Sequence, residues 1–171
     1  MKKPLAIVDV ETTGLWAATN RIIEVGLIRV ENGQVVEKYE QLINPDRPLP
    51  WFITRHTGIT SAMVQNAPRF GQIMPDLKRL LKGCVFVAHN VRFDYSFLEQ
   101  EYHRQGLRFR SPQMCTVELS RQLFPHERYH GLDHIIRRFD IKCPDRHRAL
   151  NDAEAVWQFI QRVQPRLVSL T

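Results

Sequence analysis

The chain has 171 residues, of which 43% are hydrophobic and 25% are charged. That length predicts a single domain able to bury roughly 70% of the surface of its unfolded chain, and the hydrophobic content excludes intrinsic disorder. No apolar run approaches the ~18 residues of a membrane span. The three cysteines, Cys84, Cys115 and Cys143, suggest neither a disulfide framework nor a zinc site. We therefore expect a reduced, cytoplasmic protein that does not associate with membranes.

The net charge of +6 is unevenly distributed along the chain. Residues 104–148 hold ten lysines and arginines against five acidic residues. Such a segment is typical of a phosphate-binding face, and equally of an ordinary solvated surface. Charge alone does not separate these two interpretations.

The predicted elements begin with strands. Residues 5–10 are apolar apart from Asp9, which predicts a buried central strand. Further strands are expected at 21–30 and 35–43, and the Asn32-Gly33 pair between them favours a tight hairpin.

Three prolines between residues 45 and 50 then predict a loop. The remaining pattern predicts a strand at 84–88 and helices at 76–82, 94–105, 115–124, 132–139 and 153–163, the last ending before Pro165. Because strands come first and helices later, the fold class is α/β with a mixed sheet.

The first strand carries an anomaly. Side chains alternate across a strand, so Ile7, Asp9 and Glu11 share one face. Two carboxylates at the end of a buried strand are costly unless a cation or hydrogen-bond donors satisfy them. Gly14, shortly after, allows a tight turn and a close approach to a ligand. The alternative is a pair of strand-end acids facing solvent.

Polar residues also follow the strand at 84–88, in the segment His89–Asp94. Asp94 lies where the next helix begins, so it could instead be an acid that complements the helix dipole. A third polar segment is His147–Ala153. Five residues on a helix turn through about 500°, so His147 and Asp152 converge only if His147 lies in the loop before the helix. Otherwise His147 is a surface residue and Asp152 or Asn151 is a cap.

Taken together, these segments resemble the DEDDh group of 3′–5′ exonucleases, which includes the proofreading epsilon subunit of bacterial DNA polymerase III, RNase T and oligoribonuclease. The matching motifs are Ile7–Leu15, His89–Asp94 and His147–Ala153, and His56–Thr60 is similar to a segment of polymerase-associated members. The resemblance covers residues 5–163. It implies an RNase H-like fold, with a central five-stranded mixed sheet flanked by helices. One exonuclease domain would then span residues 1–171, with a short tail that could lead into a longer protein.

The resemblance also implies the active-site residues. The catalytic set is Asp9, Glu11, Asp94, His147 and Asp152. The four carboxylates would bind two divalent cations, Mg²⁺ or Mn²⁺, which prefer oxygen ligands and together support in-line phosphoryl displacement. His147, with an ordinary pKa near 6.5, suits the role of general base.

Substrate-binding roles follow from the same resemblance. Thr12, Thr13, Gly14 and Leu15 would line the pocket for the terminal nucleotide, and His56, Asn90 and Phe93 would flank it. Phe93 could instead belong to the core, and Asn90 could cap a helix.

The role of Trp16 is open, and a series of histidines is not expected to bind metal. Trp16 could stack on a base or pack against the sheet. His126, His130 and His134 recur at every fourth residue, but Pro125 and Gly131 break the helix that a metal stripe would need. A loop followed by a helix start is expected there.

The predicted function is hydrolysis of terminal phosphodiesters at the 3′ end of single-stranded nucleic acid, releasing nucleoside 5′-monophosphates. DNA is favoured, in a proofreading or repair role and with a polymerase or repair complex as a possible partner. One alternative is an exoribonuclease of the RNase T or oligoribonuclease type, which would contact the 2′-hydroxyl. Another is a non-catalytic nucleic-acid-binding or docking module of the same fold.

Overall fold

The computed structural model describes residues 3–168, with side chains as far as residue 165. The strands are β1 (Leu5–Thr12), β2 (Ile22–Glu31), β3 (Gln34–Leu42), β4 (Val85–Ala88) and β5 (Gln113–Cys115). The helices are α1 (Trp51–Thr57), α2 (Ser61–Val64), α3 (Phe70–Leu81), α4 (Val91–Arg104), α5 (Thr116–Leu123), α6 (Leu132–Arg138) and α7 (Ala149–Val168). None of the helices within the described residues is long and apolar enough to cross a membrane.

The five strands form one mixed sheet in the order β3-β2-β1-β4-β5. β2 runs antiparallel to both β1 and β3, whereas β4 runs parallel to β1 and to β5. Asn32 and Gly33 both have positive φ, 51° and 79°, as the tight hairpin between β2 and β3 requires. The predicted α/β fold with a five-stranded mixed sheet is confirmed.

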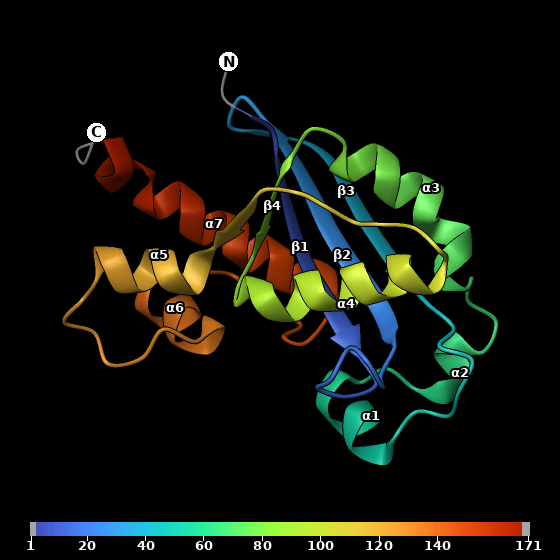
Figure 1. Ribbon diagram of the computed structural model, residues 1–171. Coiled ribbons are helices and arrows are strands. Elements are labelled where there is room, and N and C mark those ends of the chain that lie inside the picture. The colour runs from blue at the N-terminus through green and yellow to red at the C-terminus, as the bar shows by residue number, and fades with distance from the viewer. Residues whose placement is uncertain (1–2, 169–171) are drawn as a thin grey trace.

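Helices cover both faces of the sheet, with α4 and α7 on opposite sides (Figure 1). The alternation of β1 sorts its side chains between two cores. Ala6, Val8 and Val10 pack with α3 and α4, while Ile7 packs with α6 and α7. Asp9 and Glu11 therefore follow Ile7 onto the α7 face.

Several predicted boundaries were wrong. The loop expected between residues 45 and 50 is present, but α1 and α2, which follow it, were not predicted, and α3 begins at Phe70 rather than at residue 76 although Pro75 lies inside it. The three residues of β5 were missed because so short a strand shows no alternation. α7 begins at Ala149 and continues through Pro165; a proline there removes only one backbone hydrogen bond near the end of the helix.

Candidate active site

The carboxylates converge where β1 extends past the end of β4. The two strands pair only as far as Ile7 and Val87, so the next part of β1 has a free edge. The Val10 N–H on that edge donates to Oδ1 of Asp94, at 3.0 Å. Asp94 lies in the first turn of α4, buried, as does Asp152 in the first turn of α7. Elements from three parts of the chain thus bring carboxylates to the end of β1.

A glycine sets the position of α7 over the sheet. A Cβ on Gly26 would lie 2.2 Å from the backbone carbon of Ala149, so only glycine allows the helix to start against β2. Gly26 pairs with Asp9 in the β1–β2 ladder. The first turn of α7, which carries Asp152, is therefore held beside Asp9.

A buried ion pair fastens the same junction. Glu24 is fully buried and accepts from Arg148 Nη2 at 2.6 Å and from the Ala149 N–H at 2.9 Å. The carboxylate of Glu24 thus satisfies an otherwise free N–H at the start of α7. Sequence patterns indicated neither Gly26 nor Glu24, because both residues act on the start of α7, which is distant in the chain.

His147 lies in the loop immediately before α7, in a left-handed conformation with φ 66°. This is the placement that lets it converge with Asp152. Ligand atoms of Glu11, His147 and Asp152 all lie within 4.8 Å of one another. The His56 ring of α1 rests against the His147 ring, with 3.9 Å between centroids.

The clustered carboxylates repel one another in a buried site. Burial raises the pKa of Asp9, and the charges of Asp94, Asp152 and Glu11 raise it further. Burial, with a contribution from Asp152, also raises the pKa of Glu11 to about 8 and that of Asp94 to about 8. These carboxyls are hard oxygen ligands whose charged form is costly without a cation, which suits Mg²⁺ or Mn²⁺.

Arg146 supplies a positive charge at this site and was not anticipated from the sequence. Its guanidinium forms ion pairs with Asp152 and with Asp133, the latter at 2.7 Å. Burial raises the pKa of Asp152, while Arg146 opposes that rise. Burial and the nearby charges of Arg146 and His56 lower the pKa of His147, which favours the neutral imidazole.

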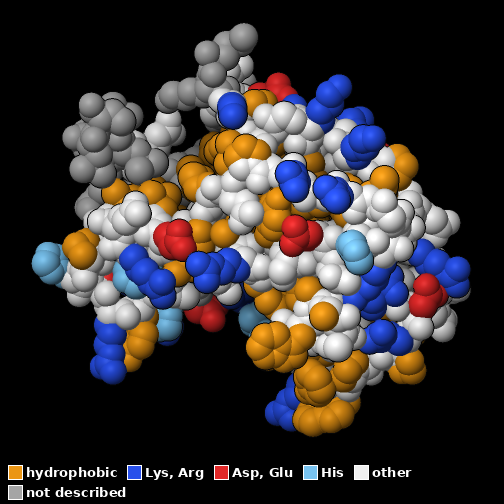
Figure 2. Space-filling model, in the orientation of Figure 1, with side chains coloured by type: hydrophobic (Ala, Val, Ile, Leu, Met, Phe, Trp, Pro, Cys, Tyr) orange, Lys and Arg blue, Asp and Glu red, His pale blue; other side chains and the backbone are white. Residues whose placement is uncertain are grey.

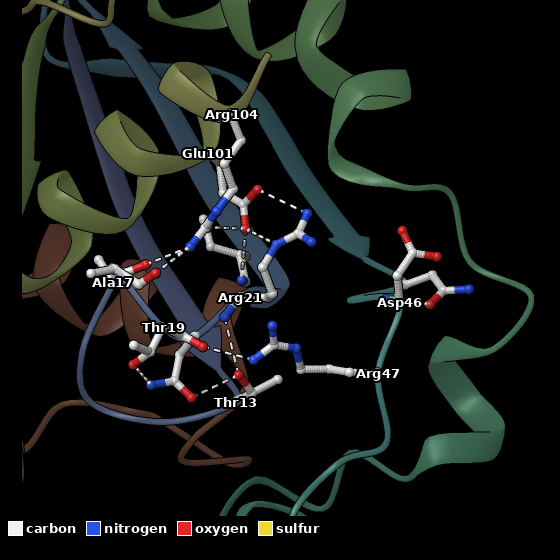
Figure 3. A network of polar contacts seen from close by, with 12 residues as sticks. Thr13, Ala17, Thr19, Arg21, Asp46, Arg47, Glu101 and Arg104 are labelled. Atoms are coloured by element: carbon white, nitrogen blue, oxygen red, sulfur yellow. Dashed lines mark hydrogen bonds and ion pairs between the residues drawn. The ribbon is translucent and has the colours of Figure 1, made fainter. Parts of the chain in front are cut away.

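The loop after β1 is pinned by arginines (Figure 3). Arg21 forms an ion pair with buried Glu101 at 2.7 Å. Arg104 donates to the Ala17 carbonyl and Arg47 to the Thr19 carbonyl, both at 2.7 Å. The loop beside the carboxylates is therefore tied to α4 and to the segment that precedes α1.

The residues expected to line the pocket for the terminal nucleotide lie at the end of β1 and in this loop. Thr12 and Thr13 are buried, and their hydroxyls donate to Gly14 O and Asn20 Oδ1. A Cβ on Gly14 would lie 2.6 Å from Asn20 Oδ1, so its close neighbour in the structure is that side chain. Leu15 is 75% exposed beside them.

The three residues expected to flank the nucleotide pocket lie in different surroundings. His56 lies beside His147, as described. Asn90 is exposed at the start of α4 with φ 68°, and its side chain makes no capping hydrogen bond. Phe93 is half-buried, packs on the α3–α4 core and contacts the Phe97 ring at 4.9 Å.

The histidines at 126, 130 and 134 form no metal stripe within residues 3–165. The first two lie in the loop before α6 and His134 in that helix. His130 Nδ1 is 2.8 Å from Ser120 Oγ, and His134 stacks on Tyr129. The expected loop followed by a helix start is confirmed.

The basic segment 104–148 does not form one free cationic face. Four of its arginines form ion pairs with acidic side chains: Arg104 with Glu101, Arg138 with Glu127, Arg146 with Asp133 and Asp152, and Arg148 with Glu24 and Glu40. Arg108 and Arg110 line a different cavity of about 870 Å³ between α3 and the end of α4. Part of the positive charge of this segment is therefore already engaged by acidic side chains of the same chain.

Comparison with known proteins gives a consistent result. Residues 6–159 match the RNase T family, described as exonuclease. The chain is 35% identical over 161 residues to the PolC-type DNA polymerase III of Caldanaerobacter subterraneus subsp. tengcongensis, and 38% identical over 151 residues to that of Bacillus subtilis. These alignments cover 94% and 87% of this chain but only 12% and 10% of the relatives.

Solved structures share the fold. Escherichia coli exonuclease I, in complex with a dT13 oligonucleotide, matches with a TM-score of 0.87 at 19% identity, over 99% of this chain and 43% of that one. Exonuclease X, in complex with 5′-overhanging duplex DNA, matches with a TM-score of 0.70 at 28% identity, over 94% and 93% of the two chains. By its family match and its PolC-type relatives, the chain belongs to the RNase T family of exonucleases, in the DEDDh class of 3′–5′ enzymes.

Proposed function

We propose that this chain hydrolyses the terminal phosphodiester at the 3′ end of single-stranded DNA and releases nucleoside 5′-monophosphates. The observation that carries this proposal is the convergence of Asp9, Glu11, Asp94 and Asp152 with His147 at one end of β1. The PolC-type relatives are DNA polymerases, which favours DNA as substrate and a polymerase as partner.

Asp9, Glu11, Asp94 and Asp152 are the residues that would hold divalent cations. Their raised pKa values support this assignment, because a bound cation offsets the repulsion that burial makes costly. Two such ions would supply Lewis-acid polarisation of the phosphate and offset the charge that develops on it. Arg146 would have to release Asp152 for that carboxylate to serve as a ligand.

His147 is proposed to take a proton from the attacking water. Its lowered pKa keeps the ring neutral and able to accept that proton. The left-handed backbone at His147 turns its ring towards Glu11 and Asp152. The ring of His56, which belongs to α1, packs against the His147 ring.

The direct test uses 5′-labelled single-stranded DNA and RNA with Mg²⁺ or Mn²⁺, with and without a chelator. We expect a ladder that shortens from the 3′ end, faster on DNA, and no cleavage in chelator. Faster cleavage of RNA would favour the exoribonuclease alternative. Internal cuts, or full activity in chelator, would contradict the proposal.

In the same assay, His147→Ala should lower kcat on the order of 10²–10⁴-fold, because general base catalysis is lost. The matched control is His103→Ala, an exposed histidine at the other end of α4. The far-ultraviolet spectrum and Tm should be unchanged in both variants. Near-normal turnover by His147→Ala would exclude it as the base.

A further inference from the structure

Helix α1 presents aromatic rings to solvent. Trp51 is 73% exposed and Phe52 is 50% exposed, and the two rings meet edge-on at 6.2 Å. On the opposite side of the helix, Ile53 packs with Ile23 of β2. The core thus accounts for one side of α1 and leaves its large aromatic side chains without a structural role.

These rings extend along α1 from the helix end that contacts the candidate active site. The His56 ring contacts the His147 ring at 3.9 Å between centroids. Phe52 lies four residues before His56, and residues at that spacing are neighbours on one helix face. Trp51 continues the series beyond Phe52. We call Trp51, Phe52 and His56 the aromatic row.

Charge around the aromatic row suits a polyanion. Arg55 lies one turn from Trp51, is exposed, and makes no ion pair or hydrogen bond with the described residues. α1 itself contains no acidic residue. The space-filling view shows a hydrophobic patch with blue side chains beside it along the lower edge of the molecule, over α1 (Figure 2). Flat exposed rings with an unpaired arginine favour stacked nucleobases over an apolar protein partner.

We propose that Phe52 and Trp51 stack on the bases immediately 5′ of the terminal nucleotide, while Arg55 attracts the backbone phosphates between them. This inference rests on the proposed function, because it uses the strand whose 3′ end occupies the carboxylate site. Since every base has a π-face, the aromatic row holds single strands with little sequence preference. It also gives a role to the exposed rings of the helix whose His56 contacts His147.

The test compares a substrate that reaches the aromatic row with one that does not. Thymidine 5′-monophosphate 4-nitrophenyl ester contains only the terminal nucleotide, whereas oligothymidylate extends along the row. For the double variant Trp51→Ala, Phe52→Ala, we expect kcat/KM on the ester to stay within about twofold of wild type. On oligothymidylate it should fall on the order of tenfold for each ring lost, mainly through KM.

Three controls sharpen the comparison. Trp51→Phe combined with Phe52→Tyr keeps the rings and should restore cleavage of oligothymidylate. Val36→Ala removes an exposed apolar side chain from β3 and should have no effect. An oligonucleotide with abasic sugars next to its terminal nucleotide should be cleaved equally by wild type and the double variant.

The outcomes separate this inference from the proposed function. If wild type cleaves both substrates and the double variant cleaves oligothymidylate equally well, stacking is excluded while the proposed function stands. Equal losses on the ester and the oligonucleotide would also overturn it, because the effect would then lie at the reacting centre. If wild type cleaves neither substrate, the proposed function fails and the inference fails with it.

Discussion

Two opposing effects act on the pKa of Asp94. Its Oδ1 accepts the Val10 N–H, which favours the charged form, yet burial raises its pKa to about 8. Burial also raises the pKa of Glu11 to about 8. The metal-free site therefore holds protons that an unfolded chain would release near pH 4.

This difference makes the metal-free protein sensitive to pH. A carboxyl with a raised pKa in the folded state stabilises the fold below its unfolded pKa, and that contribution is lost as pH rises to its folded pKa. In chelator, we predict that Tm falls between about pH 4 and pH 8. Asp94→Asn should reduce this fall and raise Tm at pH 8, because asparagine keeps the oxygen that accepts from Val10 without the charge.

Thermal melts across that pH range check this prediction. Asp76→Asn, which changes an exposed acid on α3, is the matched control and should follow wild type. The same dependence of Tm on pH in wild type and Asp94→Asn would show that the buried carboxylate cluster does not govern it.

At the level of elements, the junction between α7 and β2 decides where the catalytic candidates lie. The helix start is close enough to the strand that any side chain at position 26 meets backbone atoms. Glu24 and Arg148 then fix its orientation. His147 and Asp152 lie just before and just after the start of α7, which these contacts hold in place.

Gly26→Ala tests that junction. Because a backbone cannot move aside as a flexible side chain can, we expect a stability loss on the order of 1–3 kcal/mol and a lower kcat as Asp152 is displaced. Denaturant melts and the oligonucleotide assay measure the two effects. Gly131→Ala is the control, because its Cβ would meet only His134 at 3.6 Å. Wild-type stability in Gly26→Ala would show that α7 can shift without cost.

Local sequence patterns predicted most of the fold. Apolar runs and amphipathic spacing located β1, β2, β3, β4 and the helices after them, and Asn32-Gly33 located the hairpin. The patterns failed where long-range packing decides structure. β5 is stabilised by pairing with β4, and α1 by burying Ile53 on β2. The resemblance to DEDDh exonucleases likewise implied that Asp94, His147 and Asp152 share one site, but nothing local indicated Arg146, Glu24 or Gly26.

For the whole molecule, the net charge of +6 says little about where nucleic acid binds. Several arginines of the basic segment are engaged by acidic partners. Arg55 is a different case, since it is unpaired among the described residues and lies near the candidate site. Its contribution to the attraction of nucleic acid can therefore be tested by itself.

Salt dependence measures how many phosphates the protein neutralises. For oligothymidylate binding in chelator, we predict that Arg55→Ala lowers the slope of log affinity against log salt by about 0.7. Lys78→Ala, on α3, should leave the slope unchanged. Fluorescence anisotropy at several salt concentrations provides the measurement. An unchanged slope in Arg55→Ala would show that no phosphate contacts it.

The convergence of β1 and α7 has a consequence for how the protein is made. Asp9 and Glu11 leave the ribosome long before His147 and Asp152, although Glu11, His147 and Asp152 cluster in the finished fold and the charge of Asp152 acts on Asp9. A nascent chain that ends after α6 contains all five strands but lacks His147 and Asp152. Nuclease activity would therefore require that α7 has emerged and packed against Gly26.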